Sequence, residues 1–438
     1  MALHSIRNIP AYYREHGLRA LVRHAFRVVS GVTQNKVDTL VRAATEALAL
    51  PSADALVEAR FDQLRALAVV RVPGAGRRVN LVTDSINAGS LFGGVGTALI
   101  LCALRANATA ARLRVVTRTE APDPRGIHRV LSANGIVPSL NPELVFIPVS
   151  GSDMFLDVHD GDEFITTSWW TTYSTLRSVA PERVTYLLQE DERMFYPHGD
   201  DWVRCQETIG RSDIRFLVNT RLLHDHLVAD GLANIARCAT WFEPAFPHAV
   251  YHAAPRQPVS KRRLCFYARP NNLRNLFYRG IELLNEALQR GILDPERWEI
   301  VFVGKDIPRL TLACGCEPRL LGTMAWDDYA AFLRTVDLGF YLMSTPHPSY
   351  PPLDLAASGG VVLTNRFGLK KDLAAYSENI VLADLDVPSL LEGLRRAVAL
   401  AQDDVSRERN YAASGLARSW TKAYEQCRFA GDAGNVLR

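Results

Sequence analysis

Short apolar runs alternate with amphipathic stretches along most of the chain. Apolar runs that end in small or polar residues are typical of buried strands. In the first half they lie at Val79–Thr83, Leu113–Thr117, Leu144–Val149, Phe164–Thr167, Val184–Leu188 and Ile214–Val218. Helical patterns separate most of them, at Gly96–Arg105, Pro124–Ala133, Thr171–Val179 and Thr220–Ala229. This alternation predicts a parallel sheet with helices on both faces.

A proline-rich segment, Trp241–Arg263, indicates a linker, and the alternation restarts after it. The second set of predicted strands is Leu264–Ala268, Trp298–Val303, Leu338–Leu342, Val361–Thr364 and Asn379–Leu382. The predicted helices are Asn275–Arg290, Trp326–Thr335, Pro352–Ser358, Lys371–Tyr376, Pro388–Ala401 and a long terminal helix from about Asp403. We therefore expect an α/β fold of two tandem Rossmann-like, doubly wound domains, 77–245 and 246–438, that face a ligand-binding cleft.

Before the first predicted strand, apolar residues recur near the period of an α-helix, which predicts a helical N-terminal extension over 1–76. Arginines at 7, 14, 19, 23 and 27 outnumber the single acid, Glu15, in the first thirty residues. Such a basic amphipathic segment is suited to peripheral contact with an anionic membrane surface. The alternative is an extension packed on the main body, with its arginines in solvent.

Composition narrows the class of protein. The chain has 438 residues, 48% apolar and 22% charged, which excludes a disordered or collagen-like chain. Fifty basic and 47 acidic side chains nearly cancel, so the net charge gives no reason to expect a nucleic-acid partner. Seven scattered cysteines without a CxxC pair favour a reduced, cytoplasmic compartment. Cys314 and Cys316 form a CxC, but zinc ligands at a recognisable spacing do not follow, so we expect no metal.

Two segments of the first half are candidates for chemistry. Gly93 and Gly94 belong to a glycine-rich turn between the first strand and its helix, where backbone N–H groups can bind an anion; the alternative is a tight structural turn. Asp191 lies in an acidic run after Val184–Leu188, and Asp84 ends the first strand. Either carboxylate can act as a general base at the rim of the cleft, unless the run is merely solvated.

The second half carries two more informative segments. Arg269 and Arg274 follow its first strand, where guanidinium groups can bind a diphosphate and stabilise it as a leaving group, or else form structural ion pairs. A proline-rich segment enters a short helix through Ser349, whose hydroxyl and helix N-terminus can hold phosphate oxygens. Asp354, one turn inside that helix, can bind the ribose hydroxyls of a nucleotide or remain in solvent.

These segments resemble a known family. FYARPNNLRNLF (266–277), MSTPHPSYPPLDLAASGGVVLTN (343–365) and YSENI (376–380) resemble the bacterial GT-B rhamnosyltransferases that build S-layer glycans and O-antigens. LFGGVGTAL (91–99) and LLQEDERMFYP (187–197) resemble the N-terminal domain of the same group. The resemblance covers the chain from about residue 79 onward.

The resemblance implies a retaining, metal-independent glycosyltransferase without a cofactor. It implies a nucleotide-sugar donor, dTDP-L-rhamnose in known members, and an oligosaccharide or lipid-linked glycan acceptor. Arg269, Arg274 or its rival Arg279 would contact the diphosphate, and Asp354 the ribose. Gly93 and Gly94 would face the donor across the cleft. The wider retaining family has two glutamates spaced by seven residues, and Pro346 stands at the first position. The corresponding sugar contact must come from elsewhere in the donor site, which we expect to include His347, Ser349 and Tyr350.

Two other functions remain open on the sequence. A nucleotide-sugar 2-epimerase has the same double-Rossmann architecture and needs no acceptor. A non-catalytic glycan-assembly subunit would keep the fold without binding a nucleotide sugar. A nicotinamide dehydrogenase is disfavoured, because neither half carries the G-x-G-x-x-G fingerprint.

Overall fold

A computed structural model describes residues 52–74, 76–87, 93–151, 153–255, 260–430 and 432. The chain divides into two compact units, Met1–Asp62 and Gln63–Arg438. The described part of the first unit holds one helix, α5 (Ala53–Arg60), whose first turn is capped by the Ser52 side chain. Residues 1–30, for which we expected membrane contact, and the rest of the predicted extension up to residue 51 lie outside the described residues.

The second unit begins with a parallel seven-stranded sheet, in the order β4-β3-β2-β6-β7-β8-β9. Its strands are β2 (Arg78–Thr83), β3 (Arg112–Thr117), β4 (Glu143–Phe146), β6 (Glu163–Thr166), β7 (Val184–Leu188), β8 (Arg215–Asn219) and β9 (Ala239–Phe242). The order runs outward in both directions from β2 and β6, which defines a doubly wound sheet with a switch point between them. All six residues of β2 are buried, which is why the strand reads as a continuous run and not as an alternation.

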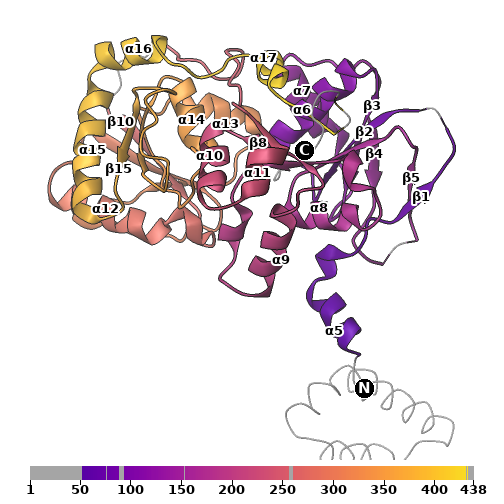
Figure 1. Ribbon diagram of the computed structural model, residues 1–438. Helices are drawn as coiled ribbons and strands as arrows, with labels where there is room; N and C mark the ends of the chain where they lie inside the picture. The colour runs from indigo at the N-terminus through magenta and orange to yellow at the C-terminus, as the bar shows by residue number, and fades with distance from the viewer. Residues whose placement is uncertain are drawn as a thin grey trace, which may run out of the picture. The chain divides into compact units, whose positions relative to one another are not determined.

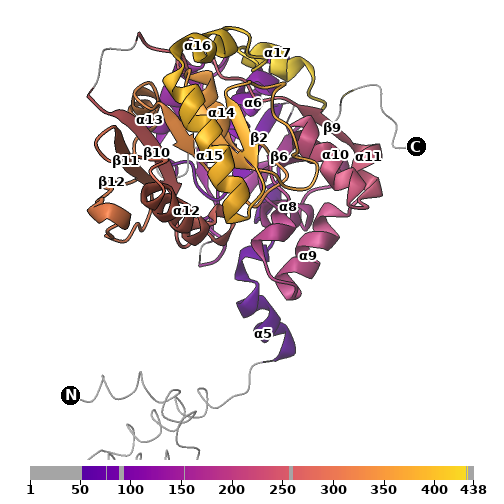
Figure 2. The ribbon, with the colours of Figure 1, turned by 90° about the vertical axis from the view of Figure 1, so that its left-hand side faces the viewer.

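Helices cover both faces of this sheet. They are α6 (Gly94–Ala108), α7 (Pro124–Ala133), α8 (Trp169–Leu176), α9 (Asp200–Ile209), α10 (Arg221–Ala229) and α11 (Ala233–Cys238). Figures 1 and 2 both show α6 on one side of the sheet and α8 and α9 on the other. The helices α9 and α11 and the strand β9 were not predicted, and β9 occupies the start of the expected linker.

A separate two-stranded parallel sheet joins β1 (Val69–Arg71) to β5 (Leu156–Val158). Both strands have only three residues, too few for an apolar pattern to reveal them. The side chain of Asp157 on β5 accepts hydrogen bonds from Arg78 and Arg114. Strand β5 therefore supplies a partner for two buried arginines of the large sheet, one on β2 and one on β3.

The second lobe is a parallel six-stranded sheet, in the order β12-β11-β10-β13-β14-β15. Its strands are β10 (Arg262–Ala268), β11 (Trp298–Gly304), β12 (Arg319–Leu321), β13 (Leu338–Phe340), β14 (Val361–Asn365) and β15 (Ile380–Ala383). The main helices around it are α12 (Phe277–Gln289), α13 (Trp326–Leu333), α14 (Tyr350–Ala357) and α15 (Val387–Gln402), seen from the side of α15 in Figure 2. The predicted fold of two doubly wound α/β lobes is therefore confirmed.

The C-terminal segment differs from the expectation. In place of one long helix, α16 (Asp404–Ala412) and α17 (Trp420–Glu425) are separated by a turn, and 371–376 forms turns and not a helix. The turn places the Gly415 backbone against Ala375, where a Cβ atom would lie 2.3 Å from the Ala375 carbonyl oxygen. A continuous helix from α16 into α17 is incompatible with this close contact.

After that turn the chain returns to the first lobe. Trp420 and Phe429 join the apolar core around α6, and the Trp420 indole donates a 3.0 Å hydrogen bond to the Asn134 side chain. The chain thus crosses between the lobes twice. Among the described residues, none of the helices combines the length and hydropathy that a bilayer crossing requires.

Candidate active site

A pocket of about 530 Å³ opens at the carboxyl ends of strands from both sheets. The first lobe contributes Gly93, Gly94 and Thr97 at the start of α6, and Gln189 and Glu190 just after β7. The second lobe contributes residues that follow β10, β11 and β13, together with the first turns of α14. This is the position where doubly wound sheets bind ligands, because the loops at the switch points diverge there.

Two cations lie side by side on the second-lobe wall of the pocket. Arg269 follows β10 and Lys305 follows β11, and the parallel register pairs the residues just before them, Ala268 with Gly304. Among the described residues, no carboxylate lies within ion-pairing distance of either cation, and the Arg269 guanidinium has only a 3.5 Å contact with the Tyr267 hydroxyl. Two neighbouring cations without a counter-ion form a site for a multiply charged anion.

Gly304 sets the spacing of these cations. Its φ is +156°, and a Cβ atom built on it would lie 1.9 Å from the carbonyl oxygen of Ala268. Only glycine permits this approach between the ends of β10 and β11. Lys305 was not among the residues expected from the sequence, although the Gly-Lys pair at the end of a predicted strand was visible there.

We expect Gly304→Ala to lower the free energy of unfolding by about 2 kcal/mol, because backbone must move to relieve the contact. Gly322→Ala is the matched control, since a Cβ atom there meets nothing within 4 Å. Thermal or chemical unfolding of the two variants measures the difference. Equal stability of both variants would contradict the close approach of the two strand ends.

Arg274 lines the same pocket but already has a partner. Its guanidinium donates a 2.9 Å hydrogen bond to the Glu190 carboxylate across the lobes, and it stacks 4.3 Å from the centre of the Phe195 ring. The other oxygen of Glu190 accepts a hydrogen bond from the Thr345 hydroxyl. Burial raises the pKa of Glu190, and Arg274 opposes that rise. Arg274 therefore contributes to contact between the lobes as well as to the wall of the pocket.

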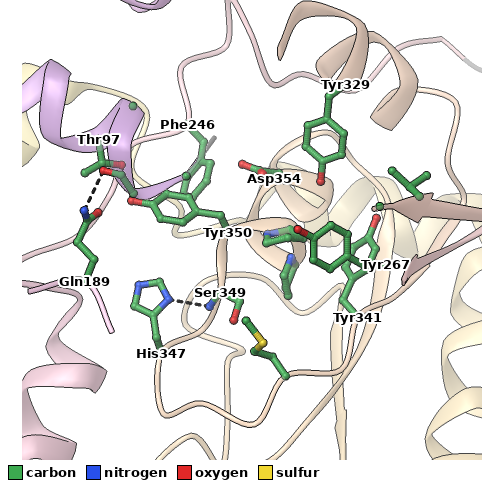
Figure 3. A pocket seen from close by; sticks show the side chains of 18 of the residues that line it. Thr97, Gln189, Phe246, Tyr267, Tyr329, Tyr341, His347, Ser349, Tyr350 and Asp354 are labelled. Atoms are coloured by element: carbon green, nitrogen blue, oxygen red, sulfur yellow. Dashed lines mark hydrogen bonds between the residues drawn. The ribbon is translucent and has the colours of Figure 1, made fainter. Parts of the chain in front are cut away.

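Asp354 lies buried in α14, one turn after the helix begins. Burial raises its pKa to about 8, against a hydrogen bond from Tyr251 that lowers it. Tyr267, Tyr329 and Tyr341 stand on the same side of the pocket in the view of Figure 3, with Asp354 facing the space between them and the first lobe. This end of the pocket combines aromatic rings with one acid, a set that suits a base and its ribose.

Tyr350, the first residue of α14, connects the lobes directly. Its hydroxyl forms hydrogen bonds with the hydroxyl of Thr97 and with the Asn219 side chain, the latter at 2.8 Å. Its ring packs on Gly93, where a Cβ atom would lie 3.1 Å away, and the Gln189 amide donates to the carbonyl of Gly94 at 2.8 Å. The glycine turn is therefore held against the second lobe by residues that occupy the pocket wall.

Three of the expected residues lie outside the pocket lining. Asp191 caps a 3-10 turn and forms a buried 2.7 Å ion pair with Arg193, so its neighbour Glu190 is the acid that reaches the pocket. Asp84 accepts a 2.8 Å hydrogen bond from the Trp170 indole, and burial raises its pKa. Arg279 forms a 2.8 Å ion pair with Glu282 on the outer surface of α12. The structure thus brings together Gly93, Gly94, Arg269, Arg274, His347, Ser349, Tyr350 and Asp354.

The CxC pair also lies away from the pocket, where Cys314 is exposed and Cys316 half-buried. Within the described ranges, no group of three His, Cys, Asp or Glu side chains is placed to hold a metal ion.

Two family matches cover most of both lobes. The family described as "WsaF, N-terminal domain" matches residues 78–220, and "WsaF, C-terminal domain" matches residues 262–395. A curated relative, the O-antigen biosynthesis protein RfbC of Myxococcus xanthus, is 30% identical over 240 residues, which is 54% of this chain. The chain spans only 18% of the length of that relative.

Solved structures share the fold at low identity. Sucrose-phosphate synthase from Thermosynechococcus elongatus has a TM-score of 0.54 at 11% identity, and the match covers 80% of this chain and 97% of that one. HepE from Anabaena, solved with UDP and glucose, has a TM-score of 0.55 at 11% identity with the same coverage. The lipopolysaccharide glycosyltransferase WaaG has a TM-score of 0.51 at 13% identity, again over 80% and 97%. Together with the two domain matches, they confirm the resemblance drawn from the sequence motifs: the chain has the GT-B fold and belongs to the WsaF family.

Proposed function

We propose that this protein is a glycosyltransferase of cell-surface glycan synthesis, and that it transfers L-rhamnose from dTDP-L-rhamnose to a glycan acceptor. Membership of the WsaF family in both lobes supports the reaction class. The similarity to a protein named for O-antigen biosynthesis supports a polysaccharide or lipid-linked glycan as acceptor. The choice of rhamnose follows from the resemblance to rhamnosyltransferases.

The observation that carries the proposal is a pair of cations, Arg269 and Lys305, that have no carboxylate partner among the described residues and line a pocket between two lobes. We place the donor diphosphate on this pair, with the nucleoside toward Asp354 and the sugar toward the first lobe. As the glycosidic bond to the diphosphate breaks, negative charge grows on the leaving oxygen, and the two cations stabilise it. We also propose retention at the anomeric carbon without a metal, following the retaining GT-B enzymes that the sequence resembles.

Binding and transfer test the proposal separately. A thermal-shift panel of dTDP, dTDP-L-rhamnose, UDP, UDP-glucose and GDP is measured first, because a ligand that binds the folded state raises the melting temperature. We expect dTDP and dTDP-L-rhamnose to give the largest shifts, and Arg269→Ala to abolish them. Arg290→Ala is the matched control, since this arginine pairs with Glu286 on the exposed face of α12. Absence of any shift would refute a nucleotide-sugar enzyme and leave a non-catalytic assembly subunit.

Transfer is then followed by mass spectrometry with a glycan acceptor, and the anomeric configuration of the product by NMR. We expect a rhamnosylated product of retained configuration. An epimerised nucleotide sugar formed without any acceptor would instead assign a 2-epimerase.

A further inference from the structure

Trp170 lies at the edge of the first sheet that faces the pocket. It is the second residue of α8, which follows β6 and is capped by the Ser168 side chain. In the sheet β6 lies between β2 and β7, and Gln189 and Glu190, just after β7, line the pocket. Neighbouring strands are about 4.8 Å apart, so the ends of β2 and β6 lie within about 10 Å of the end of β7. A ligand at Trp170 is therefore next to a ligand in the pocket.

Two contacts fix the Trp170 ring. Its indole Nε1 donates a 2.8 Å hydrogen bond to Oδ2 of Asp84, which directly follows β2. Its ring lies edge-on to the buried Trp169 ring, with centres 6.0 Å apart and an interplanar angle of 87°. Trp169 is held in turn, because its indole donates to the Tyr196 hydroxyl and its backbone N–H to the Glu192 carboxylate. Trp170 is nevertheless only half-buried, so part of the fixed ring is open to a ligand.

Asp84 has an unused hydrogen-bond acceptor beside this ring. Its Oδ2 accepts from Trp170, whereas its Oδ1 has no donor among the described residues and is not sealed from solvent. Burial raises the pKa of Asp84, and both the Trp170 hydrogen bond and the charge of Arg118 oppose that rise. The Arg118 guanidinium donates to the carbonyls of Ile147 and Arg65. Its charge close to Asp84 disfavours a cationic ligand at this carboxylate.

An indole ring and a carboxylate oxygen side by side match the chemistry of a sugar. The face of an aromatic ring is negative, and the C–H bonds on a face of a hexose carry a small positive charge, so the two pack together. A sugar hydroxyl donates a strong hydrogen bond to a carboxylate oxygen, because the acceptor is charged. A phosphate is repelled by Asp84, and a cation by Arg118. The pair therefore suits a neutral, hydroxylated ring.

We propose that Trp170 and Asp84 form a carbohydrate subsite of the first lobe. A hexose packs on the Trp170 indole, and one of its hydroxyls donates a hydrogen bond to Oδ1 of Asp84. The assignment of this hexose to the glycan acceptor rests on the proposed function, in which the donor sugar extends toward the first lobe. Because Asp84 lies outside the lining of the pocket, we assign it to binding and not to general-base catalysis.

Saturation-transfer NMR with methyl α-L-rhamnopyranoside tests the subsite directly, with dTDP present in all samples. We expect saturation transfer to the ring protons of the glycoside in the wild type and loss of most of it in Trp170→Leu. Trp170→Phe keeps an aromatic face and should retain most of the transfer. Trp241→Leu is the matched control, since this tryptophan is also half-buried and lies on β9, three strands away from β6.

Transfer kinetics separate binding from chemistry. Initial rates are measured with dTDP-L-rhamnose as donor and the same glycoside as acceptor. We expect Trp170→Leu and Asp84→Asn each to raise the acceptor KM about tenfold at unchanged kcat, and to leave the affinity for dTDP unchanged within about twofold. A large fall in kcat for Asp84→Asn at unchanged KM would make Asp84 the general base and overturn the inference.

The binding data can also contradict the subsite. Equal saturation transfer in the wild type and Trp170→Leu would place the glycoside elsewhere, and absence of transfer in the wild type would exclude the subsite. Losses in both Trp170 variants that only follow a fall in melting temperature would overturn the inference too. If the glycoside binds as expected while no nucleotide sugar binds, the subsite stands and the proposed function fails.

Discussion

Replacing Arg269 and Lys305 together by alanine is expected to lower kcat/KM for sugar transfer about a thousandfold. A hydrogen bond to a charged group contributes about 1.5–3 kcal/mol, and each 1.4 kcal/mol of transition-state stabilisation is about tenfold in rate. Each single substitution should therefore cost between about tenfold and a hundredfold. Initial rates with dTDP-L-rhamnose, compared with those of Arg290→Ala, measure the effect.

The same substitutions should leave the protein about as stable as the wild type. Neither cation has a carboxylate partner among the described residues, so its removal breaks no ion pair. A melting temperature that falls in proportion to the activity would show that these side chains stabilise the fold and do not bind the donor.

Asp354→Asn is expected to stabilise the ligand-free protein increasingly as the pH rises. The pKa of Asp354 is raised by burial from an ordinary value near 3.8 to about 8. Between these values the unfolded chain is ionised while the folded protein holds the proton, so this group destabilises the fold by about 1.4 kcal/mol more with each pH unit. Below pH 3.8 this destabilisation is absent, and above about pH 8 it no longer increases.

Chemical unfolding of the wild type and Asp354→Asn at pH 5, 6, 7 and 8 measures this difference. We expect the difference to grow by about 1.4 kcal/mol per pH unit in favour of the variant. We also expect dTDP to bind the variant about tenfold more weakly, because the ribose loses an acceptor. A difference that does not change with pH would contradict the buried, proton-holding state of Asp354. A buried acid that costs stability is typical of a residue kept for binding.

Much of the architecture could be predicted because the sheets are parallel. Their central strands are buried on both faces and appear in the sequence as continuous apolar runs, such as Val184–Leu188. The three-residue strands β1, β5 and β12 give no such signal. The return of α17 to the first lobe could not be predicted, because it depends on contacts of Trp420 with residues far away in sequence, such as Asn134, which lies 286 positions earlier.

The candidate site could be predicted where a side chain follows directly from a strand end. Arg269 and Lys305 are both such residues. Lys305 would have been added to the predicted site if the parallel pairing of β10 with β11 had been known, because that pairing places it next to Arg269. The choice between Glu190 and Asp191 needed the structure, because Asp191 caps the 3-10 turn Glu192–Phe195 and pairs with Arg193.

The two crossings between the lobes run next to each other. The backbone N–H of Phe246 in the first crossing donates a 2.7 Å hydrogen bond to the carbonyl of Ala417 in the second. The Arg418 guanidinium donates hydrogen bonds to the carbonyls of Phe246 and Tyr251. Two adjacent connections of this kind restrict relative motion of the lobes more than a single connection would. A single backbone cut in either connection would leave the two lobes covalently joined through the other.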